Sequence, residues 1–494
     1  MLDRLKKTLR HSIVYSLGNI STKIVGLILL PLYLDYLTTE DYGILAILEV
    51  SNLILVGIFD LNLPTALLRW GAETKDERGI KKLIFTSTIT TFVVSVLLCV
   101  FLIPLSGNFS SVFFDSPDYS NYFILLFLST SIGIFNNIPL TIARLNEKPI
   151  FYTATTTFRL IIILTLNIYF IVSLGMGVEG IILSQVIGHA VITLLCLPML
   201  FKNIVFSIDY KVLWDMLKYS FPLIFAYISS TVLTLGDRYL LNYFLSLSSV
   251  GIYSLGYKIA SVLKVFLIQS FQIGFIPFAF KMIGQKDSQR FFSKILTYFV
   301  FLLVIGTLIL SLFGKEAIEL LTSNREYDIA YTLIPIISLS FILLGMMSMF
   351  LLGFHYTKRT TFNAYIVISG AVLNIALNLL LIPLLDFYGS AVSMVISFLI
   401  MTMLSYKYSQ KVYFIPYEIK KISLMILLGS AYYFLSLFLN DLELVVRVLI
   451  KIVMLASFPF LLYHFKFYEA IELLTIKRIA SHWNNPSEWM RLFK

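Results

Sequence analysis

Six ionisable side chains stand out within the long apolar stretches of this sequence. An ionised group near the centre of a bilayer costs about 2.5–3.5 kcal/mol on insertion scales, so each is a candidate functional residue. Four of the six are basic and two are acidic, which favours an anionic ligand such as a phosphate or a uronic acid. The candidate cavity residues are Lys23, Arg159, Lys258 and Lys264, and the candidate coupling or ion-pair carboxylates are Glu49 and Asp60.

Several of these candidates also have a structural interpretation. Lys258 lies near enough to the end of its apolar stretch to reach the membrane surface by snorkelling, and it is equally able to pair with a carboxylate. Glu49 is a suitable structural partner for a lysine, and Asp60 lies within reach of the membrane surface. A role in a cavity is favoured for the deeper basic residues Lys23, Arg159 and Lys264.

No catalytic or metal-binding pattern accompanies these residues. The five histidines are dispersed, and the sequence has no His-Glu-x-x-His motif, phosphate-binding loop or Asp-x-Asp pair. Cys99 and Cys196 both lie in apolar runs, which excludes a disulfide framework and a cysteine metal site. We therefore expect no enzymatic activity, no cofactor and no metal.

The elements that position these charges are predicted to be membrane-spanning helices. The chain of 494 residues is 58% hydrophobic and 13% charged, with a mean hydropathy of +0.87, far from the composition of a soluble domain. The apolar runs are continuous and of helix length, which excludes a β-barrel. We expect fourteen spans, near 12–34, 42–65, 83–104, 120–142, 151–173, 179–201, 216–236, 250–276, 294–313, 329–353, 362–384, 389–406, 422–439 and 445–465.

The distribution of basic residues supports this count and predicts an orientation. With a cytoplasmic N-terminus, 29 Lys and Arg residues lie in cytoplasmic segments, and the outer segments hold only Arg238, Lys315 and Arg325. Basic residues collect in cytoplasmic loops of membrane proteins, so we expect both termini to be cytoplasmic. The net charge of +10 is thus a topology signal, and no nucleic acid is expected as a partner.

An internal repeat divides the predicted spans. Six spans separate the matching segments, so the two copies share one orientation and are related by an axis along the membrane normal. We predict two six-helix bundles, residues 1–208 and 209–410, followed by an extra helix pair with an interfacial tail, residues 411–494. The matching segments are 36–44 with 244–252 at an offset of 208, 180–187 with 389–396 at 209, and 166–168 with 373–375 at 207.

Several motifs resemble those of the bacterial polysaccharide-biosynthesis flippases, which include the O-antigen and teichuronic-type transporters of the multidrug, oligosaccharidyl-lipid and polysaccharide exporter superfamily. The resemblance covers essentially the whole chain in span number, duplication and orientation. The motifs are Gly18-Asn19-Ile20, Pro31-Leu32-Tyr33-Leu34, Thr39-Glu40-Asp41-Tyr42-Gly43, Asp237-Arg238-Tyr239 and Val250-Gly251-Ile252-Tyr253-Ser254.

The resemblance implies a function and a location in the cytoplasmic membrane. A family member flips an undecaprenyl-pyrophosphate-linked oligosaccharide from the inner to the outer leaflet by alternating access, alongside glycosyltransferases and a polysaccharide polymerase. Related lipid II flippases place cationic cavity residues on spans one, two and eight. Lys23, Lys258 and Lys264 match spans one and eight by helix, whereas span two departs from the pattern with Glu49 and Asp60. These two carboxylates are candidates for coupling to H⁺ or Na⁺.

Three other functions remain open at this point. A cation-coupled drug exporter of the same superfamily would line its cavity with acidic and aromatic groups, against which the buried cations argue. The chain could also be a transport-inactive scaffold for envelope assembly or a glycan-transferring membrane enzyme. A scaffold would tolerate Lys23 and Lys264 changed to alanine.

Overall fold

The protein is described by a computed structural model that covers residues 26–285, 287–356, 361–469 and 473–474. This part of the chain is helical and contains no strand. The α-helices are α2 (Leu30–Tyr36), α3 (Thr39–Phe59), α4 (Leu63–Glu73), α5 (Glu77–Leu102), α6 (Ser106–Phe114), α7 (Ser120–Leu145), α8 (Pro149–Ile168), α9 (Gly177–Lys202), α10 (Tyr210–Leu235), α11 (Asp237–Phe244), α12 (Leu247–Ala260), α13 (Ser270–Met282), α14 (Ser288–Leu312), α15 (Gly314–Leu321), α16 (Leu333–Phe350), α17 (Leu352–Tyr356), α18 (Thr361–Leu385), α19 (Phe387–Val412), α20 (Ile419–Leu437) and α21 (Leu444–His464).

Five shorter helical segments connect or extend these helices. Three are 3₁₀ turns near one end of the bundle, and two are π-helical segments inside the fifth and eighth predicted spans. They are η1 (Ile103–Leu105), η2 (Pro117–Tyr119), η3 (Tyr169–Ser173, π), η4 (Leu263–Gln269, π) and η5 (Arg325–Thr332).

Within the described ranges, thirteen helical stretches are long and apolar enough to cross a membrane. They correspond one to one to the second through fourteenth predicted spans. The first predicted span, 12–34, begins outside the described residues, and its described part belongs to a shorter apolar helix, Gly26–Tyr36. The predicted all-α, multi-span membrane fold is therefore confirmed.

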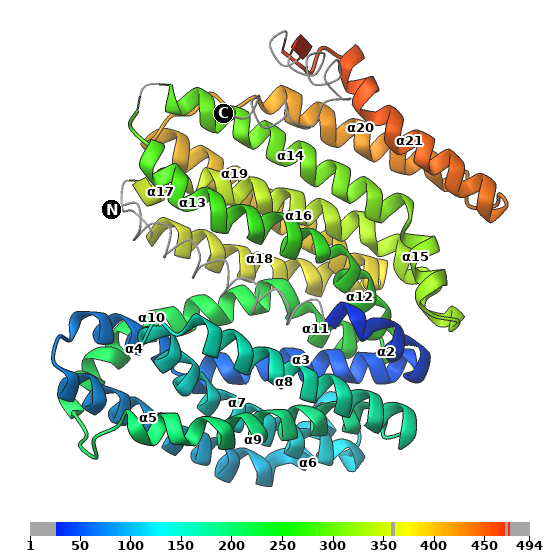
Figure 1. The fold of residues 1–494 in the computed structure, drawn as a ribbon. Coiled ribbons are helices and arrows are strands. Elements are labelled where there is room, and N and C mark those ends of the chain that lie inside the picture. Colours follow the sequence, from blue (N-terminus) through cyan, green and yellow to red (C-terminus); the bar gives the residue numbers. More distant parts are fainter. Residues whose placement is uncertain (1–25, 286, 357–360, 470–472, 475–494) are drawn as a thin grey trace, which may run out of the picture.

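The helices form two groups that meet at one end of the molecule (Figure 1). Helices α3 to α9 make up the lower group in the picture, and α13 to α19 make up most of the upper group. The groups meet where α3 packs along α12, close to α2 and α11, and α10 packs against α3, α4 and α18. We call this end of the molecule the α6–α15 end, after the two short helices that lie there.

Equivalent elements recur about 208 residues apart, as the internal repeat predicts. Helices α3 and α12 begin at Thr39 and Leu247, and the short helices α6 and α15 begin at Ser106 and Gly314. The capping groups recur as well, because the hydroxyls of Thr38 and Ser246 each accept a hydrogen bond from the backbone N–H three residues on. A side-chain cap of this kind satisfies an orphan N–H at the helix start and fixes where the helix begins.

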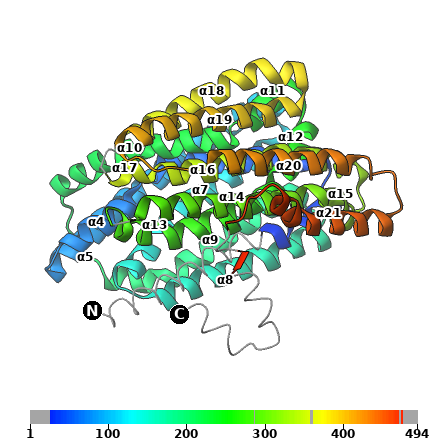
Figure 2. The ribbon, with the colours of Figure 1, turned by 90° about the horizontal axis from the view of Figure 1, so that it is seen from above.

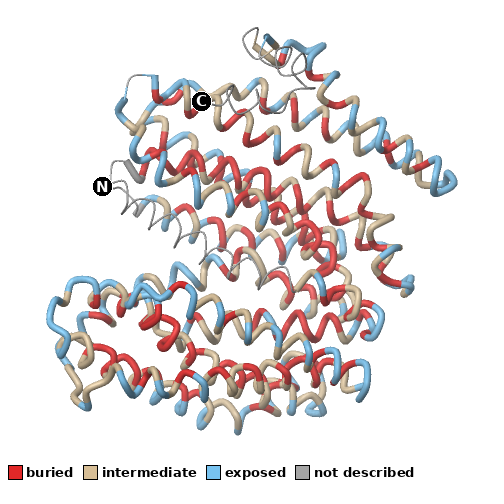
Figure 3. Tube along the Cα trace, in the orientation of Figure 1, coloured by how far each residue is buried: buried red, intermediate tan, exposed pale blue. Residues whose placement is uncertain are grey.

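The upper group packs around one deeply buried helix. Helix α16 is the centre of the second group, in contact with α12, α14 and α19, and its membrane stretch is 78% buried, as its red trace in Figure 3 shows. Outward faces elsewhere carry exposed large apolar side chains such as Phe101 and Leu427, at 65% and 66% exposure. Such faces suit contact with lipid hydrocarbon, where association does not depend on hiding apolar groups from water.

The last two helices, α20 and α21, lie side by side outside the second group in both Figure 1 and Figure 2. At the α6–α15 end, Arg447 and Lys451 of α21 pair with Glu316 of α15 at 2.7 Å each, and Arg447 also reaches Glu319 at 3.1 Å. The basic side chains are almost fully buried, at 5% and 2% exposure. These ion pairs fasten α21 to the repeat.

A second ion-pair cluster fastens the opposite end of this helix pair. Lys294 of α14 contacts Glu418, the residue before α20, at 2.9 Å, and it also contacts Glu469 beyond α21 at 2.5 Å. Burial alone would raise the pKa of Glu418, but hydrogen bonds from Lys294, Lys421 and Thr297 outweigh it and hold that pKa below its usual value. The hydrogen bond from Lys294 likewise lowers the pKa of Glu469.

Candidate functional site

Two adjoining cavities lie between α3, α10 and the eighth span, formed by α12, η4 and α13. Their volumes are about 430 Å³ and 150 Å³. They share one set of lining residues, so they form one region, which we call the central cavity. The shared residues are Glu49, Leu53, Leu235, Tyr257, Lys258 and Ser261.

Lys258 projects from α12 into both parts of the central cavity. Its ammonium lies 5.8 Å from the ring centre of Tyr33 and 5.7 Å from that of Tyr42, within the range of cation–π attraction. The Tyr42 hydroxyl also lies close enough to this ammonium to interact with its charge. The two tyrosines therefore stabilise the Lys258 ammonium without a salt bridge to a carboxylate among the described residues.

Glu49 lies in the cavity on α3 and is exposed. It is close enough to Lys258 to act on its charge electrostatically, yet the salt bridges in the described part of the chain include neither residue. The carboxylate and the ammonium thus face the same space, and each keeps hydrogen-bonding capacity for another group.

Lys264 lines the larger part of the cavity from the π-helical segment η4. Short π-helical segments are rare and occur often at functional sites. Gln269, at the end of the same segment, also lines this part. The eighth span therefore presents two lysines to the cavity, with a change of helix type between them.

Arg238 is a cavity residue that the sequence analysis placed in an outer loop. It lines the smaller part of the central cavity from α11 and is only 3% exposed. Its guanidinium lies 4.2 Å from the ring centre of Tyr257 and 5.0 Å from that of Tyr253, and it forms a salt bridge with Asp237. Burial opposes the charge of Arg238, but Asp237 and the two tyrosines outweigh it and raise the pKa of the guanidinium.

Asp237 connects Arg238 to α12 and α19. Its other carboxylate oxygen accepts hydrogen bonds from the Tyr253 hydroxyl at 2.6 Å and from the Ser390 hydroxyl of α19 at 3.1 Å. The sequence signal for this arrangement was the Asp-Arg pair directly after Gly236, which is part of one of the family motifs. The sequence analysis used Arg238 only as a basic residue of an outer segment. The short helix α11 beyond the span places the pair inside the bundle.

The other predicted site residues lie apart from the central cavity or outside the described residues. Asp60, at the C-cap of α3, accepts a hydrogen bond from the Asn137 amide of α7 at 3.1 Å. Arg159 of α8 lies within electrostatic range of His189 on α9. Neither residue lines the two cavities that form the site, and Lys23 lies outside the described residues.

The central cavity is closed at the α6–α15 end by a symmetric crossing of α3 and α12. A methyl group added to Gly43 would collide with the backbone carbonyl of Leu247, and one added to Gly251 would collide with that of Thr39. Each collision is the image of the other at an offset of 208. Around the crossing, the Thr39 hydroxyl is 2.7 Å from the Ser248 hydroxyl and donates to Glu326 at 2.9 Å.

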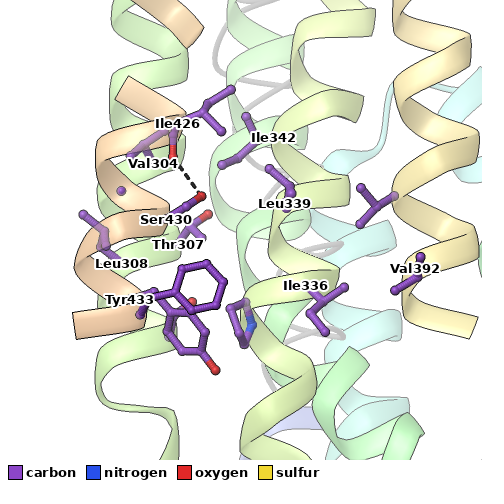
Figure 4. A pocket seen from close by; sticks show the side chains of 15 residues that line it. Val304, Thr307, Leu308, Ile336, Leu339, Ile342, Val392, Ile426, Ser430 and Tyr433 are labelled. Atoms are coloured by element: carbon purple, nitrogen blue, oxygen red, sulfur yellow. Dashed lines mark hydrogen bonds between the residues drawn. The ribbon is translucent and has the colours of Figure 1, made fainter. Parts of the chain in front are cut away.

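A separate apolar pocket of about 270 Å³ lies in the second repeat between α14, α16, α19 and α20 (Figure 4). It shares no lining residue with the central cavity. Among the described residues there is no group of three or more His, Cys, Asp or Glu side chains that could hold a metal ion. The central cavity is therefore the region where charges from both repeats converge.

Comparisons with known proteins agree with this architecture. A family profile described as "Polysaccharide biosynthesis protein" matches residues 8–283, and the MatE profile matches residues 222–380. No curated protein sequence matches the chain.

Solved structures of two kinds share the fold. The lipid II flippase MurJ in an inward closed conformation has a TM-score of 0.70 at 16% identity, covering 92% of this chain and 100% of that one. A multidrug resistance MATE family transporter of the MOP superfamily has a TM-score of 0.65 when inward-facing, at 15% identity and 82% and 95% coverage. A MATE family transporter in an outward-facing conformation has a TM-score of 0.59, at 15% identity and 85% and 96% coverage.

Proposed function

The chain belongs to the polysaccharide biosynthesis protein family, and from this premise we propose that it is a flippase for an undecaprenyl-pyrophosphate-linked oligosaccharide. It has the fold of the multidrug, oligosaccharidyl-lipid and polysaccharide exporter superfamily, in which a transport role is expected. The cargo crosses from the inner to the outer leaflet by alternating access, with its headgroup in the central cavity and its hydrocarbon in the bilayer.

The observation that carries this proposal is the charge of the central cavity. Lys258, Lys264 and Arg238 line it from the second repeat, against Glu49 from the first and Asp237, which is already paired with Arg238. Cations inside the membrane are costly, so Lys258 and Lys264 are candidate functional residues. A pyrophosphate compensates such charges, since it carries several acceptor oxygens and Lys and Arg donors match it.

Alternating access follows from the packing of the repeats. Two bundles related by an axis along the membrane normal are able to rock about a midplane site. The Gly43–Gly251 crossing joins the bundles at the α6–α15 end, and separating α3 from α12 opens the cavity there. Glu49, in the cavity, and Asp60, outside it, are the candidate carboxylates for coupling to an H⁺ or Na⁺ gradient.

The proposed setting extends the sequence analysis. The protein lies in the cytoplasmic membrane with both termini in the cytoplasm, so the α6–α15 end faces outward. Residues 1–208 and 209–410 are the two moving bundles, and residues 411–494 add the extra pair and tail. Glycosyltransferases supply the cargo on the cytoplasmic side, and a polysaccharide polymerase receives it outside.

A cation-coupled exporter of small molecules is the second candidate. It is favoured by the MatE match over residues 222–380 and by Glu49, Tyr42 and Tyr257 in the cavity, which suit a cationic cargo. The two functions predict different effects when charges in the central cavity are removed. Removing lysine charge impairs a flippase of anionic lipids, whereas removing the Glu49 charge impairs an exporter of cations.

The test is export of surface polysaccharide from cells that carry Lys258→Ala or Lys264→Ala. We expect either change to abolish export while the protein reaches the membrane at its normal level. Lys211→Ala, an exposed position at the start of α10, is the matched control and leaves export unchanged. Normal export from both cavity variants would exclude the flippase assignment, and drug sensitivity caused by Glu49→Gln alone would favour the exporter. A scaffold would tolerate every one of these changes.

A further inference from the structure

The Lys258 side chain crosses from the second repeat into the first. It belongs to α12, whereas four residues of the first repeat lie around its end. A methyl group added to Gly26 would lie 4.0 Å from the Lys258 Cε. The ammonium lies 5.8 Å and 5.7 Å from the ring centres of Tyr33 and Tyr42, and Glu49 of α3 acts on the same charge from within the cavity. The charge of one repeat is thus stabilised by groups of the other.

The direction of a helical side chain explains how Lys258 reaches this aromatic pair. Every Cα–Cβ bond of an α-helix is tilted towards the N-terminus, so a long side chain covers the turn before its own. Helix α12 begins at the α6–α15 end, where Gly43 and Gly251 bring α3 and α12 into contact. Lys258 and Glu49 follow these glycines by seven and six residues, so they start from about the same depth. The lysine therefore extends towards the crossing, and Tyr42, directly before Gly43, lies beside its ammonium.

Tyr42 also belongs to the packing that closes the α6–α15 end. It is 3% exposed, and its ring meets that of Tyr327 edge to face, with 6.1 Å between the ring centres and 89° between the planes. The Tyr327 hydroxyl, on η5, lies 3.2 Å and 2.9 Å from the backbone carbonyl oxygens of Leu37 and Thr38, just before α3. Tyr42 therefore contacts both the cation of the cavity and the elements that close the cavity.

Separating α3 from α12 changes how strongly an anion binds at Lys258. The lysine moves with α12, whereas Tyr33, Tyr42 and Glu49 move with α2 and α3. In the closed arrangement an anion competes with two ring faces for the ammonium and is repelled by Glu49. Both effects weaken when the helices separate, so the same anion binds the open arrangement more tightly. A ligand shifts a conformational equilibrium by the difference in its affinity for the two states, and here that difference favours opening.

We propose that Lys258, Tyr33 and Tyr42 form an aromatic latch, which couples the anionic headgroup of the cargo to the crossing of α3 and α12. This inference rests on the proposed function, because the cargo supplies the pyrophosphate. With the cavity free of anion, the two rings hold the ammonium and keep α3 against α12. A pyrophosphate in the central cavity draws the ammonium away from the rings, and the crossing opens. Tyr33 and Tyr42 are positioning residues, since they act on the cargo only through Lys258.

The other cavity cation that lies over tyrosine rings differs from Lys258 in this respect. Arg238 lies over Tyr253 and Tyr257 of α12 and pairs with Asp237, which is its neighbour in the chain. These partners belong to the same repeat as Arg238 and move with it. Opening therefore does not separate Arg238 from them, and an anion at this guanidinium gains little from the change. Lys258 is the better sensor because its partners lie across the boundary between the repeats.

The first test needs no ligand. Spin labels at Glu40 and Ser249, at the starts of α3 and α12, report opening of the α6–α15 end in the purified full-length protein. Tyr42→Leu is expected to shift the closed-to-open ratio towards open about two- to thirtyfold, the range for one cation–π contact. Lys258→Met loses both ring contacts and shifts it at least as far, whereas Tyr42→Phe keeps the ring face and shifts it less. Tyr243→Leu, at a position of α11 that is 79% exposed, is the matched control and leaves the ratio unchanged.

A double-mutant cycle separates the latch from ordinary packing. Because Tyr42 acts through the Lys258 charge, Tyr42→Leu is expected to shift the ratio less in a protein that already carries Lys258→Met than in the wild type. Fully additive shifts would overturn the proposal, as would an unchanged ratio in Lys258→Met. A shift in Tyr42→Phe as large as that in Tyr42→Leu would also overturn it, since the ring face would then have no part in the effect.

The second test adds inorganic pyrophosphate, with sodium chloride at equal ionic strength as the control. We expect pyrophosphate to lengthen the distance between the labels in the wild type and to leave it unchanged in Lys258→Met. Calorimetric titration of the same samples measures whether pyrophosphate binds. Binding without a change in distance would overturn the latch and leave the flippase proposal standing. Absence of binding would overturn the latch as well, and the flippase proposal would then fall only if Lys258→Ala and Lys264→Ala also exported polysaccharide normally.

Discussion

The crossing of α3 and α12 predicts that one methyl group shifts the protein between conformations. In Gly43→Ala the new Cβ meets the Leu247 carbonyl, and backbone cannot move aside as a flexible side chain does. Overpacking a tight contact costs about 1–3 kcal/mol, and separating α3 from α12 relieves it. A bias of this size changes the ratio of closed to open molecules about 5- to 150-fold.

The measurement is the distance between spin labels placed at Glu40 and Ser249, two residues at the starts of α3 and α12. Gly43→Ala and its repeat image Gly251→Ala are both expected to lengthen this distance and to reduce polysaccharide export. Gly107→Ala, which meets no atom within 4 Å, is the control and leaves both readouts unchanged. Unchanged distances in Gly43→Ala and Gly251→Ala would show that the crossing is not a gate.

Three further predictions concern the charges. Glu316→Gln removes the one carboxylate among the described residues that pairs with buried Lys451, so we expect a loss of up to about 3–5 kcal/mol in detergent stability. Adding Lys451→Met restores most of that stability in the same thermal-unfolding assay, and no recovery would refute the pairing argument. Asp237→Asn leaves Arg238 buried without its counterion and is expected to reduce stability and export, whereas Asp35→Asn, at an exposed position, does neither. Glu418 and Glu469 have lowered pKa values, so their stabilisation is complete above the ordinary carboxyl value of 4.5 and is lost as pH falls below it. Glutamates titrate between about pH 6 and about pH 3. Over this range the melting temperature of Glu418→Gln/Glu469→Gln is therefore expected to fall less than that of the wild type, and parallel curves would contradict this.

The span pattern was predictable because it depends on composition over about twenty residues at a time. Thirteen predicted spans correspond to helices, and the repeat offset of 208 recurs in the starts of α3 and α12. The composition of a twenty-residue segment does not predict the direction of a short helix that follows a span. Arg238 was assigned to a loop because loop position was the only criterion, and α11 places it inside the bundle.

The charges of the last span show a second limit. Arg447 and Lys451 lie within the predicted span 445–465, but they were not among the candidate intramembrane cations. Their partners, Glu316 and Glu319, are more than 120 residues away in sequence, and a contact at that separation depends on how helices pack. For Arg159, likewise, depth along the helix was predictable, but its direction towards α9 and away from the central cavity was not.

The burial of Arg447 and Lys451 constrains how the protein is made. A helix that carries two basic residues inserts less readily by itself, since each costs up to about 2.5–3.5 kcal/mol, the value for a helix centre. Their acidic partner Glu316 leaves the ribosome long before them. We therefore expect helix α21 to enter the membrane onto a docking surface already built by α15, so its insertion depends on a correctly assembled second repeat.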